Sequence, residues 1–514
     1  MYYRDRGQSM RSSSGYPVLS PQDAAGWIRD GETIGFSGFT AAGTPRTMAA
    51  AIAERAASER AAGRKFRIRA IGVGTGASLD GVLSDAIDRR TPYQSDPKLR
   101  NRINSGECRF LDMHISQLTQ ALRYGFLGAM EWAIVEAADV LPNGGILLTS
   151  AVGGTPTFCA RAERILVELN RRHPPALYGI HDIYEPADPP FRREIPIYRP
   201  SDRIGTPLVH VDPDKIEAVI ESDSPDEGAV FHAANGTTRR IGENVAEFLA
   251  REVATGRLPR AFLPVQSGVG DIANAVLGAL GNHPGIPTFE MYTEVLQDSV
   301  IRLMDAGRVR FASCCSLTLS PQTLRRVYAD LDNYRPRLVL RPQEITNHPE
   351  VVRRLGLISI NTALEVDIFG NVNSTHAFGT RMLNGIGGSG DFTRNAYLSI
   401  FTCPSTAKSN TVSALVPMVT HVDHTEHSVH VIATEWGVAD LRGRAPRERA
   451  LAIIDNCAHP DFRGELRHYL ELSRDGHTPH YLRAAFDFYK RYDHTGDMRQ
   501  RPAQAAEIAA AAAG

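Results

Sequence analysis

The sequence has few cysteines and no excess of either charge. Its 514 residues include 6 cysteines, and none of them forms a Cys-x-x-Cys pair or a disulfide-like spacing. We therefore expect cysteines that pack in the interior of a protein from a reducing compartment. The 57 Lys and Arg residues almost balance the 58 Asp and Glu residues, which leaves a formal net charge of -1. No overall field favours nucleic acid or an anionic membrane, so an anionic ligand must be held by local groups.

Long apolar runs are also missing. The sequence has no stretch of about 18 apolar residues that could cross a membrane, and residues 1–6 (MYYRDR) lack the apolar segment of a secretory signal. We expect a cytoplasmic location, with neither a membrane nor a nucleic acid as partner. Residues 1–16 and residues 501–514 are predicted to be flexible tails that carry no function.

The sequence does contain an alternation of short β-rich runs and longer helical patterns. Residues 33–38 are strand-like, Thr44 is the predicted helix N-cap before Pro45, and residues 48–57 continue as an Ala-rich helix. A Pro-rich stretch over residues 182–214 interrupts this pattern and is typical of a crossover between two halves.

The second half repeats the order of strand, glycine loop and helix. Residues 261–265 are strand-like, the loop contains Gly268 and Gly270, and residues 272–280 have a helical pattern. Alternation of this kind predicts an α/β fold with mainly parallel sheets and helices on both faces.

One glutamate has a setting that suits covalent chemistry. Glu294 lies among apolar and amide neighbours in residues 291–298 (MYTEVLQD), between the glycine-rich residues 266–274 (QSGVGDIAN) and 384–392 (NGIGGSGDF). An ionised glutamate is a nucleophile that can attack an activated carbonyl group. Glycine-rich loops expose backbone N–H groups that can stabilise the resulting oxyanion. We therefore predict that Glu294 carries the chemistry.

These stretches, together with residues 35–40 (GFSGFT), 179–183 (GIHDI) and 434–443 (TEWGVADLRG), resemble the acetyl-CoA hydrolase/transferase family of class I coenzyme A transferases. The resemblance covers nearly the whole chain. It implies two related open α/β domains, at residues 17–224 and 225–500, with the active site between them. It also implies coenzyme A as a substrate, no permanently bound cofactor, an acyl-CoA and a small carboxylate as partners, and a homodimer.

The resemblance assigns roles residue by residue. Glu294 would form a glutamyl-CoA thioester, and Asn347 would donate to the glutamyl carbonyl. Glu435 would line the acyl pocket. The remaining residues would bind coenzyme A or the oxyanion: Gly268, Val269, Gly270, Asn384, Gly388 and Lys408, the last as a partner for a CoA phosphate.

Two departures leave the substrates open. Residues 216–238 contain no Lys or Arg, and Asp223, Asp226 and Glu227 make this stretch acidic, whereas some relatives carry arginines there. Trp436 stands where a smaller polar residue is familiar and could narrow the acyl pocket. Acetate, propionate and succinate therefore all remain candidates, and an acyl-CoA hydrolase using the same site is an alternative activity.

Two further patterns suggest other classes of protein. Residues 72–77 (GVGTGA) follow a predicted strand and fit the Gly-x-Gly-x-x-Gly/Ala fingerprint of dinucleotide-binding sites, and residues 385–390 (GIGGSG) fit it by spacing alone. A nicotinamide-dependent oxidoreductase is therefore the second hypothesis. Neither motif is followed by a strand that ends in an acidic residue about 20 positions later. His421, Asp423, His424 and His427 offer metal ligands at close spacing, but a strand would turn alternate ligands to opposite faces. We predict no metal.

Overall fold

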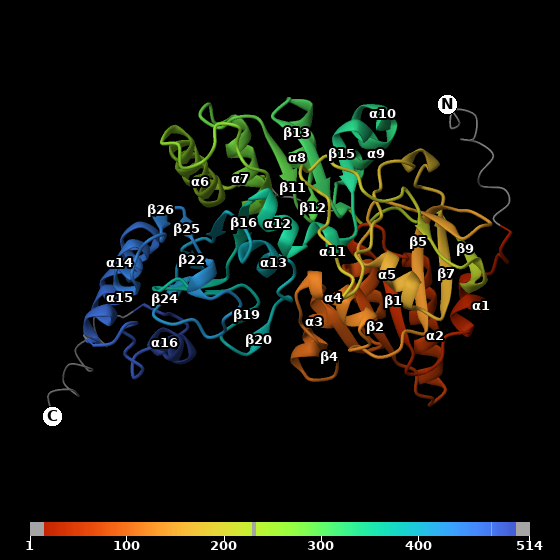
Figure 1. The fold of residues 1–514 in the computed structure, drawn as a ribbon. Helices are drawn as coiled ribbons and strands as arrows, with labels where there is room; N and C mark the ends of the chain where they lie inside the picture. The colour runs from red at the N-terminus through yellow and green to blue at the C-terminus, as the bar shows by residue number, and fades with distance from the viewer. Residues whose placement is uncertain (1–14, 229–232, 474, 500–514) are drawn as a thin grey trace.

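The computed structural model describes residues 15–228, 233–473 and 475–499. Over these residues the chain forms two α/β halves, each built around its own large sheet. Figure 1 shows the N-terminal half in red to yellow and the C-terminal half in green to blue, side by side. The predicted tails lie almost entirely outside the described residues.

The sheet of the N-terminal half is mostly parallel. Its strand order is β4-β3-β2-β1-β5, after which β5 pairs with both β7 and the antiparallel β6. β9 follows β7 in parallel, and β8 follows β6. The strands are β1 (Thr33–Thr40), β2 (Ile68–Gly74), β3 (Ile87–Pro92), β4 (Arg109–Phe110), β5 (Trp132–Val140), β6 (Gly145–Leu148), β7 (Arg164–Asn170), β8 (Val209–His210) and β9 (Ile216–Ser222). The α-helices are α1 (Pro21–Gly26), α2 (Arg46–Ala61), α3 (Pro97–Asn104), α4 (Ile115–Arg123) and α5 (Thr155–Arg161).

The sheet of the C-terminal half has the order β15-β13-β11-β10-β16-β21-β25-β26, and only β26 runs antiparallel among these described strands. Its strands are β10 (Val265–Ser267), β11 (Phe289–Tyr292), β13 (Val309–Cys314), β15 (Leu338–Leu340), β16 (Ile358–Thr362), β21 (Leu398–Thr402), β25 (Val431–Thr434) and β26 (Gly437–Asp440). A separate parallel pair, β12 (Val295–Leu296) and β14 (Ser316–Leu317), extends from the ends of β11 and β13.

Helices cover this second sheet. The larger ones are α6 (Gly236–Ala254), α7 (Asp271–Asn282), α8 (Asp298–Asp305), α9 (Pro321–Ala329), α12 (Pro349–Leu355), α14 (Pro446–Cys457), α15 (Pro460–Leu472) and α16 (Asp487–Thr495). Two short helices, α11 (Gln343–Thr346) and α13 (Ser389–Thr393), lie near the centre of Figure 1, where the halves meet. No helix in the described ranges is long and apolar enough to span a membrane.

The alternation read from the sequence is confirmed, with local corrections. Thr44 is not the N-cap of α2, because the helix begins at Arg46 directly after Pro45, and the buried Thr44 hydroxyl caps nothing. The strand expected at 261–265 begins only at Val265, where β10 first pairs with β16. The cysteines are all buried and free, as expected for packing residues.

The two halves share one continuous core. A single cluster of buried apolar side chains includes Phe39 and Val135 from the first half and Val295 and Leu340 from the second. Backbone hydrogen bonds cross the boundary as well, for example from Val152 N–H to the Cys315 carbonyl at 3.0 Å. This packing fixes the positions of the loops of both halves relative to each other at the site described next. The domain boundary at 224/225 stays a prediction.

Candidate active site

Glu294 lies in the short connection between β11 and β12. Its carbonyl accepts hydrogen bonds from Cys315 N–H at 2.8 Å and Ser316 N–H at 3.0 Å, and the preceding Thr293 N–H donates to the Ser313 carbonyl at 2.9 Å. The backbone on both sides of Glu294 is therefore held by β13 and β14. Because its main chain is fixed, the carboxylate has a defined direction into the cavity between the halves.

Asn347 holds the Glu294 carboxylate. Its amide nitrogen donates to Glu294 Oε1 at 2.6 Å and to Asp391 Oδ2 at 3.2 Å. The Asn347 oxygen accepts from the Thr346 hydroxyl at 2.8 Å, which directs the amide nitrogen toward the two carboxylates. Asp391 in turn accepts from Ser116 N–H at 3.0 Å and from the Ser116 hydroxyl at 2.6 Å. Ser116 belongs to α4, so a residue of the N-terminal half supports this pair.

The environment raises the pKa of both carboxyl groups. Burial raises the pKa of Glu294 to about 8; the hydrogen bond from Asn347 opposes this increase, and the nearby Asp391 adds to it. Burial also raises the pKa of Asp391 to about 6, while hydrogen bonds from Ser116 and Asn347 act in the opposite direction. A weakly solvated carboxylate of raised pKa is a stronger nucleophile when it is ionised, and such shifts are frequent at functional sites.

The glycine loop after β10 offers one free donor. Gly268 N–H donates to the Ile360 carbonyl at 3.0 Å, and Gly270 N–H donates to Gln297 Oε1 at 3.2 Å. Gln297 also donates back to the Gly268 carbonyl at 2.9 Å, which fixes the loop. Within the described parts of the chain, no acceptor is recorded for Val269 N–H. Of the three predicted loop donors, Val269 N–H is therefore the one left available to a ligand.

Gly388 makes the closest approach to the carboxylate. A Cβ atom built on Gly388 would lie 1.8 Å from Glu294 Oε1 and 2.3 Å from Asn347 Nδ2. Only glycine allows the backbone to lie this close. Asp112 of the N-terminal half holds the same loop, because its carboxylate accepts from Ile386 N–H at 3.0 Å. The loop after β20 (Arg381–Met382) is thus positioned by both halves.

These groups meet at a cavity of about 170 Å³ between the two halves. Predicted site residues that line it are Gly268, Val269, Glu294, Asn384 and Gly388. Sequence reasoning missed Phe39, Thr40, Val73, Tyr93 and Ile115, which form the opposite wall from the N-terminal half. It also missed Asp391 and Ser116. Phe39, Thr40 and Val73 lie in the glycine-containing stretches 35–40 and 72–77, and Asp391 lies in 384–392, but no spacing along the chain relates any of them to Glu294. The residues of the N-terminal half join the site only through the docking of the two halves.

Four predicted residues lie outside the lining of this cavity. Gly270 and Asn347 are bonded to residues of the site, because Gly270 N–H donates to Gln297 and the Asn347 amide donates to Glu294, whereas Lys408 and Glu435 have other partners. Lys408 is exposed and donates to the Tyr492 hydroxyl at 2.5 Å, with its Nζ also 4.8 Å from the centre of the Tyr492 ring. The Glu435 carboxylate accepts from Ser405 N–H at 2.9 Å, and the indole of Trp436 donates to the Ser405 hydroxyl at 3.0 Å. The geometry therefore does not bring Lys408 or Glu435 to Glu294.

The dinucleotide-like loop at residues 72–77 already holds an anion of the protein. Glu227 accepts from the N–H groups of Ala77 and Ser78, each at 3.1 Å, and a Cβ on Gly76 would lie 2.7 Å from its carboxylate. The Glu227 carboxylate therefore engages backbone N–H groups of the kind that a pyrophosphate would need at such a loop. The loop thus offers no support for the oxidoreductase hypothesis.

Two histidines of residues 421–427 have polar partners within the protein. His424 Nε2 lies 3.1 Å from the Ser389 hydroxyl, next to Gly388, and His421 Nε2 lies 3.2 Å from Asp423. Among the described residues, the group whose ligand atoms are close enough to share an ion is elsewhere, at Glu136, His173 and Asp226.

Known proteins match the chain over almost its whole length. The models of the acetyl-CoA hydrolase/transferase N-terminal domain and C-terminal domain match residues 5–221 and 324–470. The propanoyl-CoA:succinate CoA transferase of Escherichia coli (strain K12) is 47% identical over 483 residues, 93% of this chain and 98% of that protein. The succinyl-CoA:acetate CoA-transferase of Clostridium kluyveri is 43% identical, over 94% of this chain and 90% of that one. An acetyl-CoA hydrolase of Schizosaccharomyces pombe is 39% identical, over 94% and 96%.

A solved structure has the same fold. The crystal structure of 4-hydroxybutyrate CoA-transferase from Porphyromonas gingivalis matches with a TM-score of 0.60 and 22% identity, covering 89% of this chain and 97% of that one. The predicted α/β fold class is thereby confirmed, as is the predicted relationship. The chain belongs to the acetyl-CoA hydrolase/transferase family.

Proposed function

We propose that this protein transfers coenzyme A from an acyl-CoA to a small carboxylate through a covalent thioester on Glu294. The observation that carries the proposal is the Glu294 carboxylate at the cavity between the halves, held at 2.6 Å by Asn347 and approached by the backbone of Gly388. A nucleophile whose position is fixed by a hydrogen bond, beside backbone donors, suits attack on a thioester.

The transfer balances without an added acid or base. The Glu294 carboxylate attacks the acyl carbonyl carbon, a C–O bond forms, the C–S bond breaks, and CoA leaves as a thiolate. The thiolate then attacks the glutamyl carbonyl of the resulting anhydride, and the original acid leaves as a carboxylate. A second carboxylate reverses these two steps on the glutamyl-CoA thioester. No net proton is taken up or released.

Oxyanions form at both carbonyls and need donors in place. For the acyl oxyanion we assign Val269 N–H, because the neighbouring Gly268 and Gly270 N–H groups are already engaged. For the glutamyl oxyanion we assign the Asn347 amide, which already holds that carboxylate. The loss of one such donor costs roughly 3 kcal/mol of transition-state stabilisation in other enzymes.

Transfer is favoured over hydrolysis by the lining of the cavity. Water must lose a proton to attack a thioester, whereas an acceptor carboxylate attacks directly. Among the described residues that line the cavity, Glu294 is the one carboxylate, and it is consumed in the thioester. The neighbouring Asp391 is held by Ser116 and Asn347 and is not part of that lining.

The remaining assignments are part of the same proposal. Lys408 is exposed and suits a phosphate of the coenzyme A nucleotide better than a group at the reacting atoms. Glu435 would contact the acyl group only if its carboxylate gave up the hydrogen bonds that it accepts from Ser405. We also propose that the protein is a homodimer, as the family resemblance implies, and that it is located in the cytoplasm.

The test is mass spectrometry of the intact protein after incubation with acetyl-CoA and brief borohydride reduction. The wild type should show reductive cleavage of a glutamyl thioester, mapped by peptide analysis to Glu294, and Glu294→Gln should show none. Glu290→Gln is the matched control, because Glu290 lies in β11, directly before the connection that carries Glu294, and outside the cavity lining. An unmodified wild type, or a label on another residue, would refute the covalent mechanism.

A further inference from the structure

Helix α4 of the N-terminal half presents one polar face to the C-terminal half. Ser116, Thr119 and Arg123 are three and four positions apart, which places their side chains on the same side of the helix. Ser116 bonds to Asp391 of α13, whereas Thr119 and Arg123 both bond to Glu344 of α11. This face of α4 therefore holds two short helices of the other half at once.

The contact with α11 fixes the backbone that carries Asn347. Helices α4 and α11 pack against each other where the halves meet (Figure 1). The Glu344 carboxylate accepts from the Thr119 hydroxyl at 2.9 Å and from two nitrogens of Arg123, each at 2.6 Å. Because α11 ends at Thr346, these bonds also determine where the Asn347 backbone lies.

The contact with α13 fixes the side chain of Asn347. Asp391 Oδ2 accepts from Ser116 N–H at 3.0 Å and from Asn347 Nδ2 at 3.2 Å, and Asp391 Oδ1 accepts from the Ser116 hydroxyl at 2.6 Å. The same Asn347 nitrogen donates to Glu294 Oε1 at 2.6 Å. A reversed amide would turn its oxygen, which only accepts, toward both carboxylates. The two acceptors together therefore specify one orientation of the amide.

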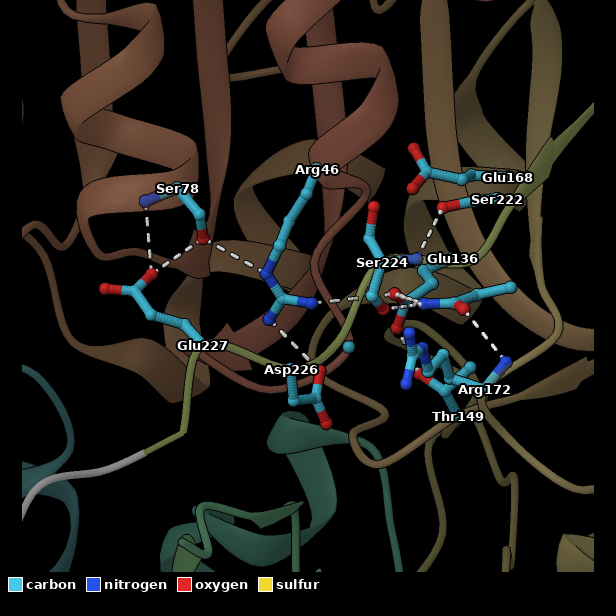
Figure 2. Close-up of polar contacts among 12 residues, drawn as sticks. Arg46, Ser78, Glu136, Thr149, Glu168, Arg172, Ser222, Ser224, Asp226 and Glu227 are labelled. Carbon is cyan, nitrogen blue, oxygen red and sulfur yellow. Dashed lines mark hydrogen bonds and ion pairs between the residues drawn. The ribbon is translucent and has the colours of Figure 1, made fainter. Parts of the chain in front are cut away.

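A buried carboxylate elsewhere in the chain offers a comparison. Figure 2 shows Glu168 with neighbouring polar residues of the N-terminal half. Its carboxylate accepts from the N–H groups of Thr47 and Met48 at 3.1 and 2.9 Å, so main-chain donors anchor it, as they anchor Asp391. Glu168 therefore matches Asp391 in burial and anchoring, but its partners lie at the start of α2 rather than at the cavity.

We propose that Asp391 is a positioning residue that keeps the Asn347 amide directed at Glu294. Ser116 of α4 holds Asp391 for this task, so the docking of the two halves completes the oxyanion site. The inference rests on the proposed function, in which the Asn347 amide stabilises the glutamyl oxyanion. Asp391 acts through Asn347 and does not itself meet the substrate.

The geometry of Asp391, rather than its charge, should carry the effect on kcat. In Asp391→Asn the new amide oxygen can accept from Ser116 N–H and from Asn347, and the new amide nitrogen can donate to the Ser116 hydroxyl, which also accepts. Asp391→Asn should therefore keep kcat within about threefold of the wild type, whereas Asp391→Ala should lower kcat by about tenfold. An Asp391→Asn protein that loses as much as Asp391→Ala would overturn the proposal.

The charge of Asp391 has a separate effect, on the pH profile. It adds to the increase in the pKa of Glu294, so Asp391→Asn should move the rise of kcat/KM to lower pH. The other ionisable groups that face Asp391 are Glu294 and His114, whose ring lies 2.3 Å from where a Cβ on Gly390 would be. Both groups stay in the variant, so the shift reports the charge of Asp391. A rise that moves to higher pH would contradict the preserved geometry.

A double-mutant cycle tests whether Asp391 acts through Asn347. If it does, Asp391→Ala should lower kcat/KM by no more than about threefold in the Asn347→Ala background, against about tenfold in the wild type. Losses that simply multiply would overturn the proposal. Ser116→Ala repeats the cycle with a milder change, because it removes the hydroxyl bond to Asp391 and keeps the N–H bond. Glu168→Gln is the matched control and should leave kcat near that of the wild type.

The failure of this inference can be told from the failure of the proposed function. If acetyl-CoA labels Glu294 and a folded Asp391→Ala protein keeps the wild-type kcat, transfer stands and the positioning role is wrong. If no acyl-CoA labels Glu294, the covalent mechanism fails and the inference fails with it.

Discussion

Replacement of Asn347 by Ala is the most direct test of how the site activates Glu294. The change removes the 2.6 Å hydrogen bond to Glu294 Oε1 and the 3.2 Å contact to Asp391. Hydrogen bonds to charged groups contribute about 1.5–3 kcal/mol, which corresponds to roughly a 10- to 150-fold loss in kcat/KM. The loss should appear mainly in kcat, because Asn347 is assigned to the glutamyl oxyanion rather than to substrate binding.

The pH dependence of kcat/KM has an expected direction that the test can check. Glu294 attacks only when it is ionised, and its pKa is raised to about 8, so wild-type kcat/KM should rise with pH to a plateau above about 8. Because the hydrogen bond from Asn347 lowers the pKa of Glu294, Asn347→Ala should move this rise to higher pH. The variant should therefore recover part of its loss at alkaline pH.

The assay is the initial rate of acyl-CoA formation from pH 6 to 10, with each protein checked for its thermal transition. Asn101→Ala, on the exposed surface of α3, is the control and should follow the wild-type profile. A profile for Asn347→Ala that coincides with the wild type in both height and midpoint would refute the assigned role. A wild-type rate that falls as pH rises would refute an ionised Glu294 as the nucleophile.

Three other perturbations test the site and its support. Gly388→Ala should lower kcat/KM by about 100-fold or more, because its Cβ would lie 1.8 Å from Glu294 Oε1. Arg123→Ala should destabilise the protein by about 3–5 kcal/mol in denaturant unfolding, because it leaves the buried Glu344 without its 2.6 Å partner across the interface between the halves. Burial raises the pKa of Glu168 to about 7, so the free energy of unfolding should fall by up to roughly 3 kcal/mol as pH rises from about 4.5 to 7.

Each of these has its own control. Gly278→Ala adds a Cβ with nothing within 4 Å and should leave both rate and stability nearly unchanged. Arg240→Ala removes an exposed ion pair of 3.4 Å and should cost less than about 1 kcal/mol. Between about pH 4.5 and 7, Glu168 stays protonated in the native state but is ionised in the unfolded chain. Glu168→Gln should therefore flatten the pH dependence of the free energy of unfolding in this range. An unchanged slope would show that the proton is held elsewhere.

Some of the architecture could be predicted from local patterns alone. The order of strand, glycine loop and helix around Gly268 and Gly270 is set by the conformational freedom of glycine and by short-range periodicity, so it was readable in the sequence. The boundary errors at Thr44 and at residues 261–265 have a common cause. Pairing with β16 and burial against neighbouring helices, rather than local propensity, decide where these elements begin.

The sequence by itself determined the family of the chain and predicted Glu294 as its nucleophile, because Glu294 and Gly388 each lie in a contiguous stretch whose residue types, together with the family resemblance, indicate a covalent carboxylate beside backbone donors. Only the tertiary structure shows the contacts that hold that carboxylate. The family resemblance alone relates Asn347 to Glu294 in the sequence, and nothing in the sequence indicates Ser116, because both lie far from Glu294 along the chain and no local spacing relates them to it. They lie beside Glu294 because the two sheets pack into one core and bring their loops together.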